Sequence, residues 1–361
     1  MKQGWKTCKF ADLFDLQMGK TPSRDNPTYW GDDNMWVSIA DMNEQKYMSA
    51  TKEGITDVAV QESGIKPIPK GTVIMSFKLS IGKVSIATSK LYTNEAIMGF
   101  IEKEEGTLVP EYLYYYLKGY KWEGANKAAM GMTLNKKTIA ENTISYPPIA
   151  EQEKIVSELD CLSGIIEKKK QQLKELDNLA QSIFYEMFGD PVENDKGWET
   201  KKVIDVVKLQ RGYDLPIQHR QSDGGIPVWG SNGIVGWHNE AKVDYGVITG
   251  RSGTLGTVYS YDKPFFPLNT TLFSVDTHGN DIVYLKYLLN IFDLKRFGTG
   301  TGVPTLNRNV FHSEPIISVP LALQQDFASK IESIEKQKEL ISQSIKETET
   351  LFNSRMDYYF N

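Results

Sequence analysis

The sequence predicts an α+β protein in which two pseudo-symmetric globular domains are separated by two long helices that form an antiparallel coiled coil. Three observations lead to this prediction. The chain contains a tandem repeat, each copy opens with short apolar runs broken by turn residues, and each copy closes with a long proline-free segment that has a seven-residue apolar rhythm. Short apolar runs are typical of strands, and a sustained heptad pattern is typical of coiled-coil helices.

The composition is that of an ordinary globular protein. Of 361 residues, 40% are hydrophobic and 24% are charged, with a mean hydropathy of −0.38, which excludes disordered, collagenous and membrane classes. Domains of about 150 residues would divide this length into two. Cys8 and Cys161 have neither metal-ligand spacing nor a disulfide framework, and no signal-peptide pattern follows Met1, so we expect a cytoplasmic protein. The net charge of −5, taken alone, argues mildly against DNA binding.

The repeat is clearest at the start of each copy. Residues 4–19 and 197–212 are identical at eight of sixteen positions, where chance alone gives about one. The offset between the copies is 193 residues at the start and 174 residues in the middle. Further on, Thr133-Leu134-Asn135-Lys136 matches Thr305-Leu306-Asn307-Arg308, and from there to the C-terminus the offset is 172 residues. The copies are therefore 4–189 and 197–361, and the Pro- and Asn-containing stretch 190–196 reads as a linker.

This map predicts four segments in chain order. We expect an N-terminal globular domain at 1–149, a central helix at 150–189, a C-terminal globular domain at 190–320 and a second long helix at 321–361. Within the globular domains, apolar runs such as 73–77 and 247–249 lie between Gly, Asn, Asp and Pro, and they predict short strands and loops.

Each long helix carries an apolar seam of five heptads, which needs a partner, and the simplest partner is the other helix. At ~1.5 Å per residue such a helix is roughly 58 Å long, which makes it a spacer. Lys169 and Lys338 interrupt the two seams; each either specifies register or extends its charge past the seam edge. The apolar seam positions are Ile155, Leu159, Leu162, Ile166, Leu173, Leu176 and Ile183 in the first helix and Phe327, Ile331, Ile334, Ile341, Ile345 and Phe352 in the second.

A pseudo-two-fold axis across the helices would make them antiparallel and would put the two globular domains at opposite ends. A DNA duplex has approximate dyads perpendicular to its own axis. Two such domains can therefore sit on one DNA face, at half-sites about one turn, ~34–36 Å, or a little more apart.

Several motifs together resemble a known family. The long helices begin at Pro147-Pro148-Ile149-Ala150-Glu151-Gln152 and at Pro320-Leu321-Ala322-Leu323-Gln324, the chain opens with a Leu-Gln-x-Gly-x-Thr-Pro-Ser pattern at 16–23, and both copies carry Thr-Leu-Asn. In order, duplication and spacing, these motifs resemble the DNA-specificity subunit of type I restriction-modification systems, across essentially the whole chain. The second copy departs from the pattern at 213–216 and at Leu323, which replaces the glutamate of the first helix start.

The resemblance implies a protein without catalytic activity of its own. Each globular domain would be a target recognition domain that reads one half of a bipartite sequence in double-stranded DNA. The helices would set the half-site spacing and dock two adenine methyltransferase subunits, and up to two nuclease/translocase subunits can join such an assembly. S-adenosylmethionine would belong to the methyltransferase, and ATP and Mg to the nuclease/translocase, so no cofactor or metal is expected in this chain.

The residues themselves also lack the motifs that the relevant enzymes need. The sequence has neither an Asn/Asp-Pro-Pro-aromatic motif with a glycine-rich cofactor loop nor a Walker-type loop. Ser80-Ile81-Gly82-Lys83 contains only the Gly-Lys fragment and reads as a turn. The glycine-rich stretch 298–302 is either a flexible loop or a cradle for a DNA phosphate.

Loops that combine base-reading side chains with positive charge or small hydroxyls are the candidate DNA contacts, although for any one residue a solvated loop side chain is an equally good interpretation. Asn135/Asn307 and Lys136/Arg308 persist in both copies, so we expect them to anchor phosphates or to have a structural role rather than to select bases. In the first domain the candidates are Lys20, Thr21, Ser23, Arg24, Lys78, Ser80, Lys83, Asn135, Lys136 and Lys137. In the second domain they are Arg211, Tyr213, Gln218, Arg220, Ser231, Asn232, Arg251, Ser252, Thr254, Thr299, Asn307 and Arg308.

Histidine and tryptophan positions add two minor expectations. His219, His238, His278 and His312 lack metal-ligand spacing and are interpreted as surface or DNA-facing residues. Trp229 and Trp237 lie in a Gly/Asn-rich stretch and are expected to be exposed.

A function of another class stays open, namely a scaffold that presents two protein-binding modules on a coiled-coil spacer and has no nucleic-acid role. The charge distribution bears on this choice. The net charge is +1 over 1–149 and −1 over 190–320, whereas it is −3 over 150–189 and −2 over 321–361. The globular domains are thus neutral in sum, and we expect the isolated chain to bind DNA weakly and to need basic surface from the methyltransferase subunits.

Overall fold

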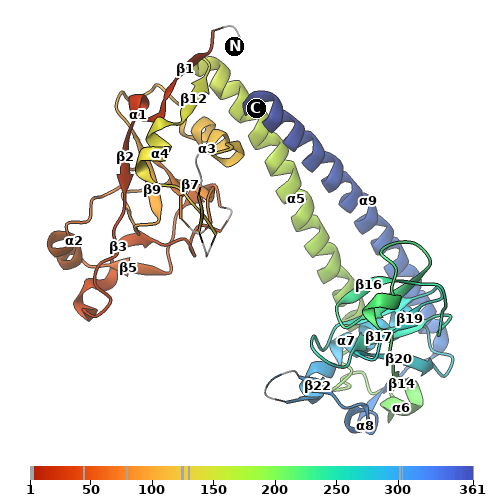
Figure 1. Cartoon of the computed structure of the whole chain (residues 1–361). Helices are drawn as coiled ribbons and strands as arrows, with labels where there is room; N and C mark the ends of the chain where they lie inside the picture. Colours follow the sequence, from red (N-terminus) through yellow and green to blue (C-terminus); the bar gives the residue numbers. More distant parts are fainter. Residues whose placement is uncertain are drawn as a thin grey trace. The chain divides into compact units, whose positions relative to one another are not determined.

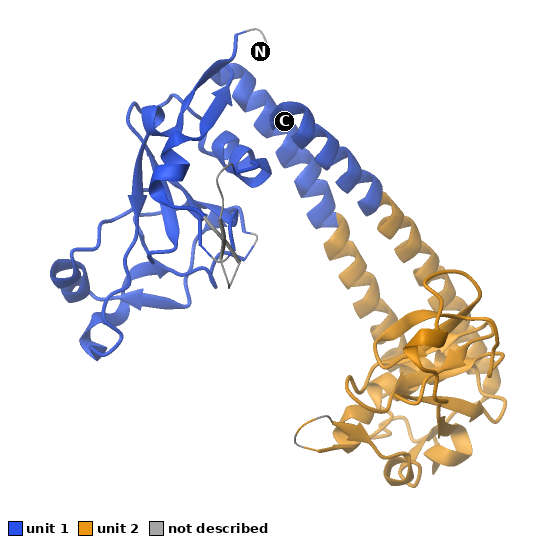
Figure 2. Cartoon of the chain, in the orientation of Figure 1, with its two compact units in different colours: residues 1–168, 345–361 blue, residues 169–344 orange. Residues whose placement is uncertain are grey.

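The computed structural model describes residues 4–43, 45–78, 80–122, 126–128, 131–300, 302 and 304–360, with the backbone alone at 126–128 and 131–133. The chain forms two compact units (Figure 2). Unit 1 contains residues 1–168 and 345–361, and unit 2 contains residues 169–344. Each unit therefore combines the globular part of one copy with a stretch of each long helix. The segment boundaries at 149, 189 and 320 stay predictions.

The globular part of unit 1 is built on two small sheets (Figure 1). The larger sheet has the strand order β2-β9-β6-β7-β4 and the smaller has the order β5-β3-β8, while β1 pairs with β12 and β10 with β11. The elements are β1 Lys6–Lys9, α1 Phe10–Leu13, β2 Phe14–Met18, β3 Trp30–Val37, β4 Tyr47–Met48, β5 Glu53–Ile55, α2 Asp57–Ser63, β6 Val73–Ser76, β7 Val84–Ala87, β8 Tyr92–Thr93, β9 Ile97–Glu102, α3 Pro110–Gly119, β10 Asn126–Ala128, β11 Gly131–Thr133, α4 Lys136–Glu141 and β12 Thr143–Tyr146, with the 3-10 turn η1 Pro27–Tyr29.

The globular part of unit 2 has the same plan. Its sheets have the orders β14-β20-β17-β18 and β16-β15-β19, while β13 pairs with β23 and β21 with β22. The elements are β13 Glu199–Lys202, α6 Val203–Val206, β14 Lys208–Arg211, β15 Ile226–Gly230, β16 Gly233–His238, β17 Gly246–Gly250, β18 Val258–Tyr261, β19 Phe266–Pro267, β20 Thr271–Asp276, α7 Ile282–Ile291, β21 Gly298–Thr299, β22 Thr305–Leu306, α8 Arg308–Phe311 and β23 Pro315–Ser318, with the 3-10 turns η2 Ile217–His219 and η3 Leu294–Phe297.

The sequence repeat is a structural repeat. The order β2-β9-β6-β7 recurs as β14-β20-β17-β18, and the parallel pair β3–β8 recurs as β15–β19. In the described part of unit 2, neither α2 nor β4 has a counterpart, and both fall in the stretch where the first copy is longer. The predicted α+β, pseudo-symmetric organisation is confirmed.

The two long helices are α5, Ile149–Phe188, and α9, Leu321–Phe360. In unit 1 the Tyr359 hydroxyl donates to a Glu158 carboxylate oxygen at 2.5 Å, and in unit 2 the Lys338 ammonium lies 2.8 Å from the Asp177 carboxylate. In each unit an early stretch of one helix meets a late stretch of the other, so the helices run antiparallel as expected. Every apolar position named for the two seams is buried or half-buried.

The end of each long helix also enters a domain core. In unit 2, Phe184 and Phe188 are fully buried against Tyr284 and Phe327, whereas the seam residue Ile183 is only partly buried. A heptad seam predicts the face that one helix buries against another helix. Here the end of the helix packs against a whole domain, so its buried face is wider than the seam. None of the described helices combines the length and apolar character needed to cross a membrane.

Buried glutamines join each globular part to its helix. The Gln152 Oε1 accepts the Val109 N–H at 2.8 Å, and its Nε2 donates to the Thr107 and Pro147 carbonyls at 3.1 and 2.9 Å. In unit 2, Gln324 Oε1 accepts the Asp281 N–H at 2.9 Å, and its Nε2 donates to Asn280 Oδ1 at 2.7 Å and to the Val319 carbonyl at 2.9 Å. Because Val109 and Asp281 directly precede α3 and α7, each glutamine ties a domain helix to the start of a long helix.

Candidate nucleic-acid interface

Unit 2 contains a cavity of about 370 Å³ into which three arginines converge. Arg211 ends β14, Arg251 follows β17 and Arg308 begins α8. The strand order β14-β20-β17 brings the first two together, and the Leu306 N–H, which donates to the Arg251 carbonyl at 2.8 Å, brings the third. None of the described residues that line the cavity is acidic. The full lining is Arg211, Arg251, Leu272, Thr299, Thr305, Leu306, Asn307, Arg308 and Asn309.

The three guanidinium groups are held to different degrees. Arg251 Nη1 donates to the Asn269 carbonyl at 3.1 Å, a bond that positions the group without neutralising it. Arg211 Nη2 lies 3.1 Å from Asp214 Oδ1, and this ion pair is exposed, so it is weak. Arg308 is half-buried and forms no ion pair with any residue in the described part of the chain. The cavity therefore has a surplus of positive charge and of N–H donors, which suits a phosphate or the acceptor edge of a base.

The Thr-Leu-Asn element has a clear structural role in both units. Leu134 and Leu306 are buried, and the asparagine that follows each one caps a short helix. The Asn135 Oδ1 accepts the Thr138 N–H at 2.8 Å, and the Asn307 Oδ1 accepts the Asn309 N–H at 3.1 Å. This capping geometry gives a structural reason for an asparagine at this position in both copies.

His312 follows α8, the short helix that Arg308 begins, and its backbone N–H donates to the Arg308 carbonyl at 2.9 Å. Its side chain is 7% exposed, and its Nε2 lies 3.2 Å from the Leu209 N–H, from which it accepts a hydrogen bond. Burial lowers the pKa of His312, and the positive charges of Arg308 and Lys208 lower the pKa further. The expectation that His312 faces solvent or DNA is therefore wrong: its ring fills a hydrogen-bonding position in the core. Trp229, also expected to be exposed, is buried at 7% against Tyr259 and Tyr261.

The corresponding positions of unit 1 carry different chemistry. The repeat counterparts of Arg211, Arg251 and Arg308 are Met18, Phe77 and Lys136. Met18 is exposed, and Phe77 is buried. Unit 1 therefore offers one lysine where unit 2 offers three arginines.

A polar contact beside these positions occurs in both units, but the residue types at its two ends are exchanged. In unit 1 the Thr21 hydroxyl donates to the Glu95 carboxylate, and at the equivalent place in unit 2 the Asn269 amide donates to the Asp214 carboxylate. The carboxylate thus comes from the later of the two loops in unit 1 and from the earlier one in unit 2. Hydrogen bonding to Thr21 lowers the pKa of Glu95, and the charge of Lys78 also lowers it.

Other candidate contacts of unit 1 are already engaged within the protein. Arg24 donates from Nη1 and Nη2 to the two Glu53 carboxylate oxygens at 2.6 and 2.9 Å, and its guanidinium lies 3.7 Å from the Trp30 ring centroid. Lys20 Nζ donates to the Ser63 carbonyl and Lys83 Nζ to the Ile39 carbonyl, at 2.5 and 3.2 Å. Ser23, Ser80, Lys136 and Lys137 are exposed.

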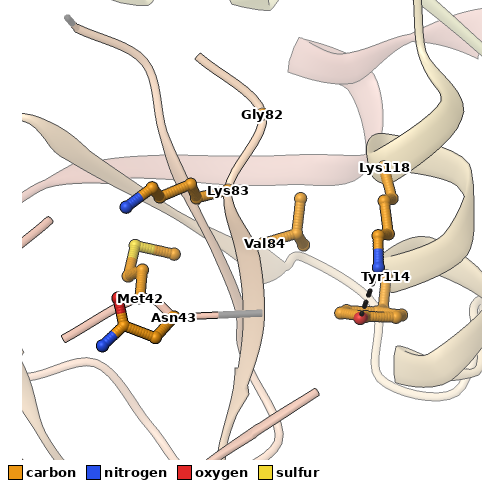
Figure 3. Close-up of a pocket in the computed structure, with 7 residues that line it drawn as sticks. All are labelled: Met42, Asn43, Gly82, Lys83, Val84, Tyr114 and Lys118. Atoms are coloured by element: carbon orange, nitrogen blue, oxygen red, sulfur yellow. Dashed lines mark hydrogen bonds between the residues drawn. The ribbon is translucent and has the colours of Figure 1, made fainter. Parts of the chain in front are cut away.

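A second cavity, of about 570 Å³, opens in unit 1 between the turn before β7 and helix α3 (Figure 3). Lys83 comes from the turn and Lys118 from α3, where its Nζ donates to the Tyr114 hydroxyl at 3.4 Å. Asn290 is the repeat counterpart of Lys118, and its amide bonds both backbone polar groups of Val258 at 2.9 and 3.0 Å. The replacement of this clamping asparagine by lysine leaves the space open in unit 1. Met42 and Asn43, from the stretch in which the first copy is longer, also line the cavity.

The remaining candidates of unit 2 do not join the arginine cavity. Arg220 donates from Nη2 and Nε to the Leu215 carbonyl at 2.9 and 3.2 Å. The Tyr213 ring packs edge-on against Phe266 and at a tilt against Phe273. Gln218, Asn232 and Thr254 are exposed on other turns, and Ser231 and Ser252 are half-exposed. Of the glycine-rich stretch, Thr299 lines the cavity, whereas Thr301 lies outside the described residues.

Sequence reasoning missed Thr305 and Asn309 of the arginine cavity, and Asn43 and Lys118 of the unit 1 cavity. Thr305 belongs to the Thr-Leu-Asn element that both copies retain, so the repeat could have identified it as a candidate. For the others no sequence pattern marks the cavity. Among the described residues, no three His, Cys, Asp or Glu side chains group in a way that would hold a metal ion.

Comparison with known proteins places this geometry in context. A family model described as the type I restriction modification DNA specificity domain matches residues 2–178 and 195–350. The type I restriction enzyme MjaIX specificity subunit of Methanocaldococcus jannaschii is 33% identical over 233 residues, which cover 59% of this chain and 54% of that protein. The HindI specificity subunit of Haemophilus influenzae is 29% identical over 178 residues, covering 46% and 38%. The chain thus spans about half the length, or less, of these curated relatives.

Two solved structures share the fold over nearly their whole length. One is a type I restriction-modification S subunit from M. genitalium, with a TM-score of 0.60 at 15% identity, covering 98% of this chain and 95% of that one. The other comes from a study of complex assembly and conformational transition of the type I R-M system, with a TM-score of 0.62 at 14% identity, covering 100% and 98%. At such identity the likeness concerns the fold alone.

Proposed function

The chain belongs to the family of type I restriction-modification DNA specificity proteins, and from this premise we propose that it is the noncatalytic DNA-specificity subunit of a type I restriction-modification complex. Each globular part is a target recognition domain that reads one half of a bipartite site in double-stranded DNA. The observation that carries the proposal is the double match to the specificity domain, at 2–178 and 195–350, on two units with a shared strand order.

The arginine cavity supports a DNA contact in the second recognition domain. Three guanidinium groups beside the hydroxyls of Thr299 and Thr305 form a donor-rich cavity lining without acidic residues, and this combination suits both phosphates and base edges. We assign Arg308 to a backbone phosphate, because its position at the retained Thr-Leu-Asn element is shared by Lys136 in the other unit. The difference between the two units at the remaining positions supports two different half-sites.

The partners follow from the same premise. Helices α5 and α9 dock two adenine methyltransferase subunits and set the half-site spacing, and up to two nuclease/translocase subunits complete the assembly. The net charges of −3 over 150–189 and −2 over 321–361 make these helices poor DNA ligands and better protein ligands. S-adenosylmethionine, ATP and Mg²⁺ then belong to the partners, which carry out the chemistry in the cytoplasm.

Duplex binding as a function of salt tests this proposal. With the cognate methyltransferase present, affinity should fall steeply as salt rises, with a log–log slope of about −0.9 for each phosphate contact. The isolated chain should bind weakly, because its globular domains are neutral in sum. A complete lack of duplex binding with the methyltransferase present would instead support the protein-binding scaffold.

A further inference from the structure

The polar contacts between α5 and α9 differ at the two ends of the helix pair. In unit 1, Glu158 accepts hydrogen bonds from the Arg355 guanidinium and, at 2.5 Å, from the Tyr359 hydroxyl. These contacts lower the pKa of Glu158 and raise that of Arg355. In unit 2, the Lys338 ammonium lies 2.8 Å from Asp177 and 3.1 Å from Glu335, and the Lys169 ammonium donates to the Ser344 hydroxyl. Lys169, Lys338, Arg355 and Tyr359 continue the heptad spacing of the seams, and Glu158 and Asp177 lie beside the seam.

The repeat shows what each helix would meet if it paired with a copy of itself in the same register. The counterparts of Arg355 and Tyr359 in α5 are Ile183 and Met187, and the counterpart of Lys338 is Ile166. In an α5–α5 pair, Glu158 would therefore face Ile183 and Met187, and Asp177 would face Ile166. Both carboxylates would lose their cationic partners. Glu158, which is half-buried, would then lie against apolar side chains, which is unfavourable for its charge, whereas the exposed Asp177 would lose only its ion pair.

A pair of two α9 helices meets a different obstacle. The α9 counterpart of Glu158 is Lys330, so Arg355 of one helix would face Lys330 of the other, and this would occur at both ends. Lys338 would meet Glu349, which is an acceptable pair, so the penalty lies at Lys330 and Arg355. Only the mixed pair of α5 with α9 brings Glu158 to Arg355 and Asp177 to Lys338.

We propose that these polar positions are a pairing code: α5 selects an α9-type helix as its partner and discriminates against a second copy of itself, and α9 does the same. The apolar seams of the two helices are alike and would permit all three combinations. Specificity then comes from the polar positions in and beside the seam, where complementary charges favour one pairing and mismatches disfavour the others. The inference is independent of DNA recognition, because it concerns only which two halves can assemble.

The test begins with the intact chain. A protease site inserted after the exposed Val192 allows the folded protein to be cut in its linker, and the cut chain is then unfolded in urea and refolded at low concentration. Native mass spectrometry counts the mixed pair and the two self-pairs. The exchange constant describes the equilibrium in which two unlike self-pairs convert into two mixed pairs. We expect it to exceed the value for random pairing about tenfold, which corresponds to about 1.4 kcal/mol in favour of the mixed pair. A random distribution of pairs would overturn the proposal.

Charge variants separate the code from general stability. Glu158→Arg or Arg355→Glu alone should move the distribution toward self-pairs, whereas the two changes together should restore the mixed pair. Lys336→Glu, which alters an exposed lysine of α9 that pairs with Glu332 of its own helix, is the matched control and should leave the distribution unchanged. If a single variant does not refold, a double-mutant cycle on the uncut chain measures the coupling between residues 158 and 355 from its unfolding midpoints. Absence of coupling in that cycle, or failure of the double variant to restore the mixed pair, would contradict the proposal.

Discussion

Gln152 and Gln324, which lie 172 residues apart at the same position of the two repeats, each make three hydrogen bonds, two of which are equivalent. In both cases the side-chain oxygen accepts the N–H that precedes a domain helix, and the side-chain nitrogen donates to a carbonyl just before the long helix. Both side chains are almost fully buried, at 0% and 1% exposed. The junction between a recognition domain and its helix is thus fixed by directional bonds as well as by apolar packing.

Replacement of Gln152 by alanine should destabilise unit 1 substantially. The change leaves the half-buried Val109 N–H and two carbonyls without their partner, and such losses cost about 2–3 kcal/mol in total. Urea unfolding of the intact chain measures the effect, and Gln172→Ala, on the exposed face of the same helix, is the control and should change stability by less than about 0.5 kcal/mol. Equal effects of the two substitutions would contradict the clamp.

The Arg308→Ala variant should weaken binding to all duplexes alike when the methyltransferase is present. Loss of one phosphate contact lowers the magnitude of the salt slope by about one unit and leaves the preferred sequence unchanged. Binding titrations over a salt series measure this, with Lys263→Ala, an exposed lysine of unit 2 outside the cavity, as the control. A change of preferred base with unaltered nonspecific affinity would refute the assignment of Arg308 to a phosphate.

The stability of unit 2 should decrease in mild acid because of His312. Its pKa in the folded state lies below the ordinary value of 6.5, so the folded protein binds fewer protons than the unfolded chain. The stabilisation is therefore complete above pH 6.5 and is lost as the pH falls toward the folded pKa. Thermal unfolding from pH 7.5 to 5 measures this, and His312→Gln, which keeps an acceptor for the Leu209 N–H but does not titrate, should flatten the profile. An unchanged profile in the variant would assign the acid sensitivity to other groups.

Arg24 distinguishes a structural arginine from a DNA contact. The Arg24 guanidinium is bonded to Glu53 and stacked on Trp30. Arg24→Ala should therefore lower the stability of the fold by less than about 1 kcal/mol, which is the range of an exposed ion pair with a cation–π contact. The same variant should leave the salt slope of DNA binding unchanged. Glu53→Ala should have a similar effect on stability. Loss of one unit of salt slope in Arg24→Ala would instead restore its interpretation as a phosphate contact.

The sequence predicts the repeat, the two helices and their antiparallel pairing because these features are periodic. A heptad pattern records one packing surface along a whole helix, and a duplication shows which positions are structurally equivalent. The pattern is least informative at the helix ends, where Phe184 and Phe188 are buried in a domain core rather than in the helix pair.

The arginine cavity is beyond sequence prediction because it depends on strand pairing. Arg211, Arg251 and Arg308 are far apart in the chain, and only the order β14-β20-β17 and the bond from Leu306 to Arg251 bring them together. Polarity likewise gives poor guidance for His312 and Arg24, because both meet their hydrogen-bonding requirements inside the protein. The positions of the hydrogen-bonding partners in the folded domain decide the roles of these residues, and a single sequence does not contain those positions.

Mapping of methylated adenines tests the central claim most directly. The intact chain is coexpressed with its cognate methyltransferase in a host that lacks adenine methylation, and the genome is read by single-molecule sequencing. We predict methylation at one bipartite, asymmetric motif whose two half-sites are separated by a fixed spacer. Absence of methylation that depends on this chain, or methylation at a single uninterrupted motif, would contradict it.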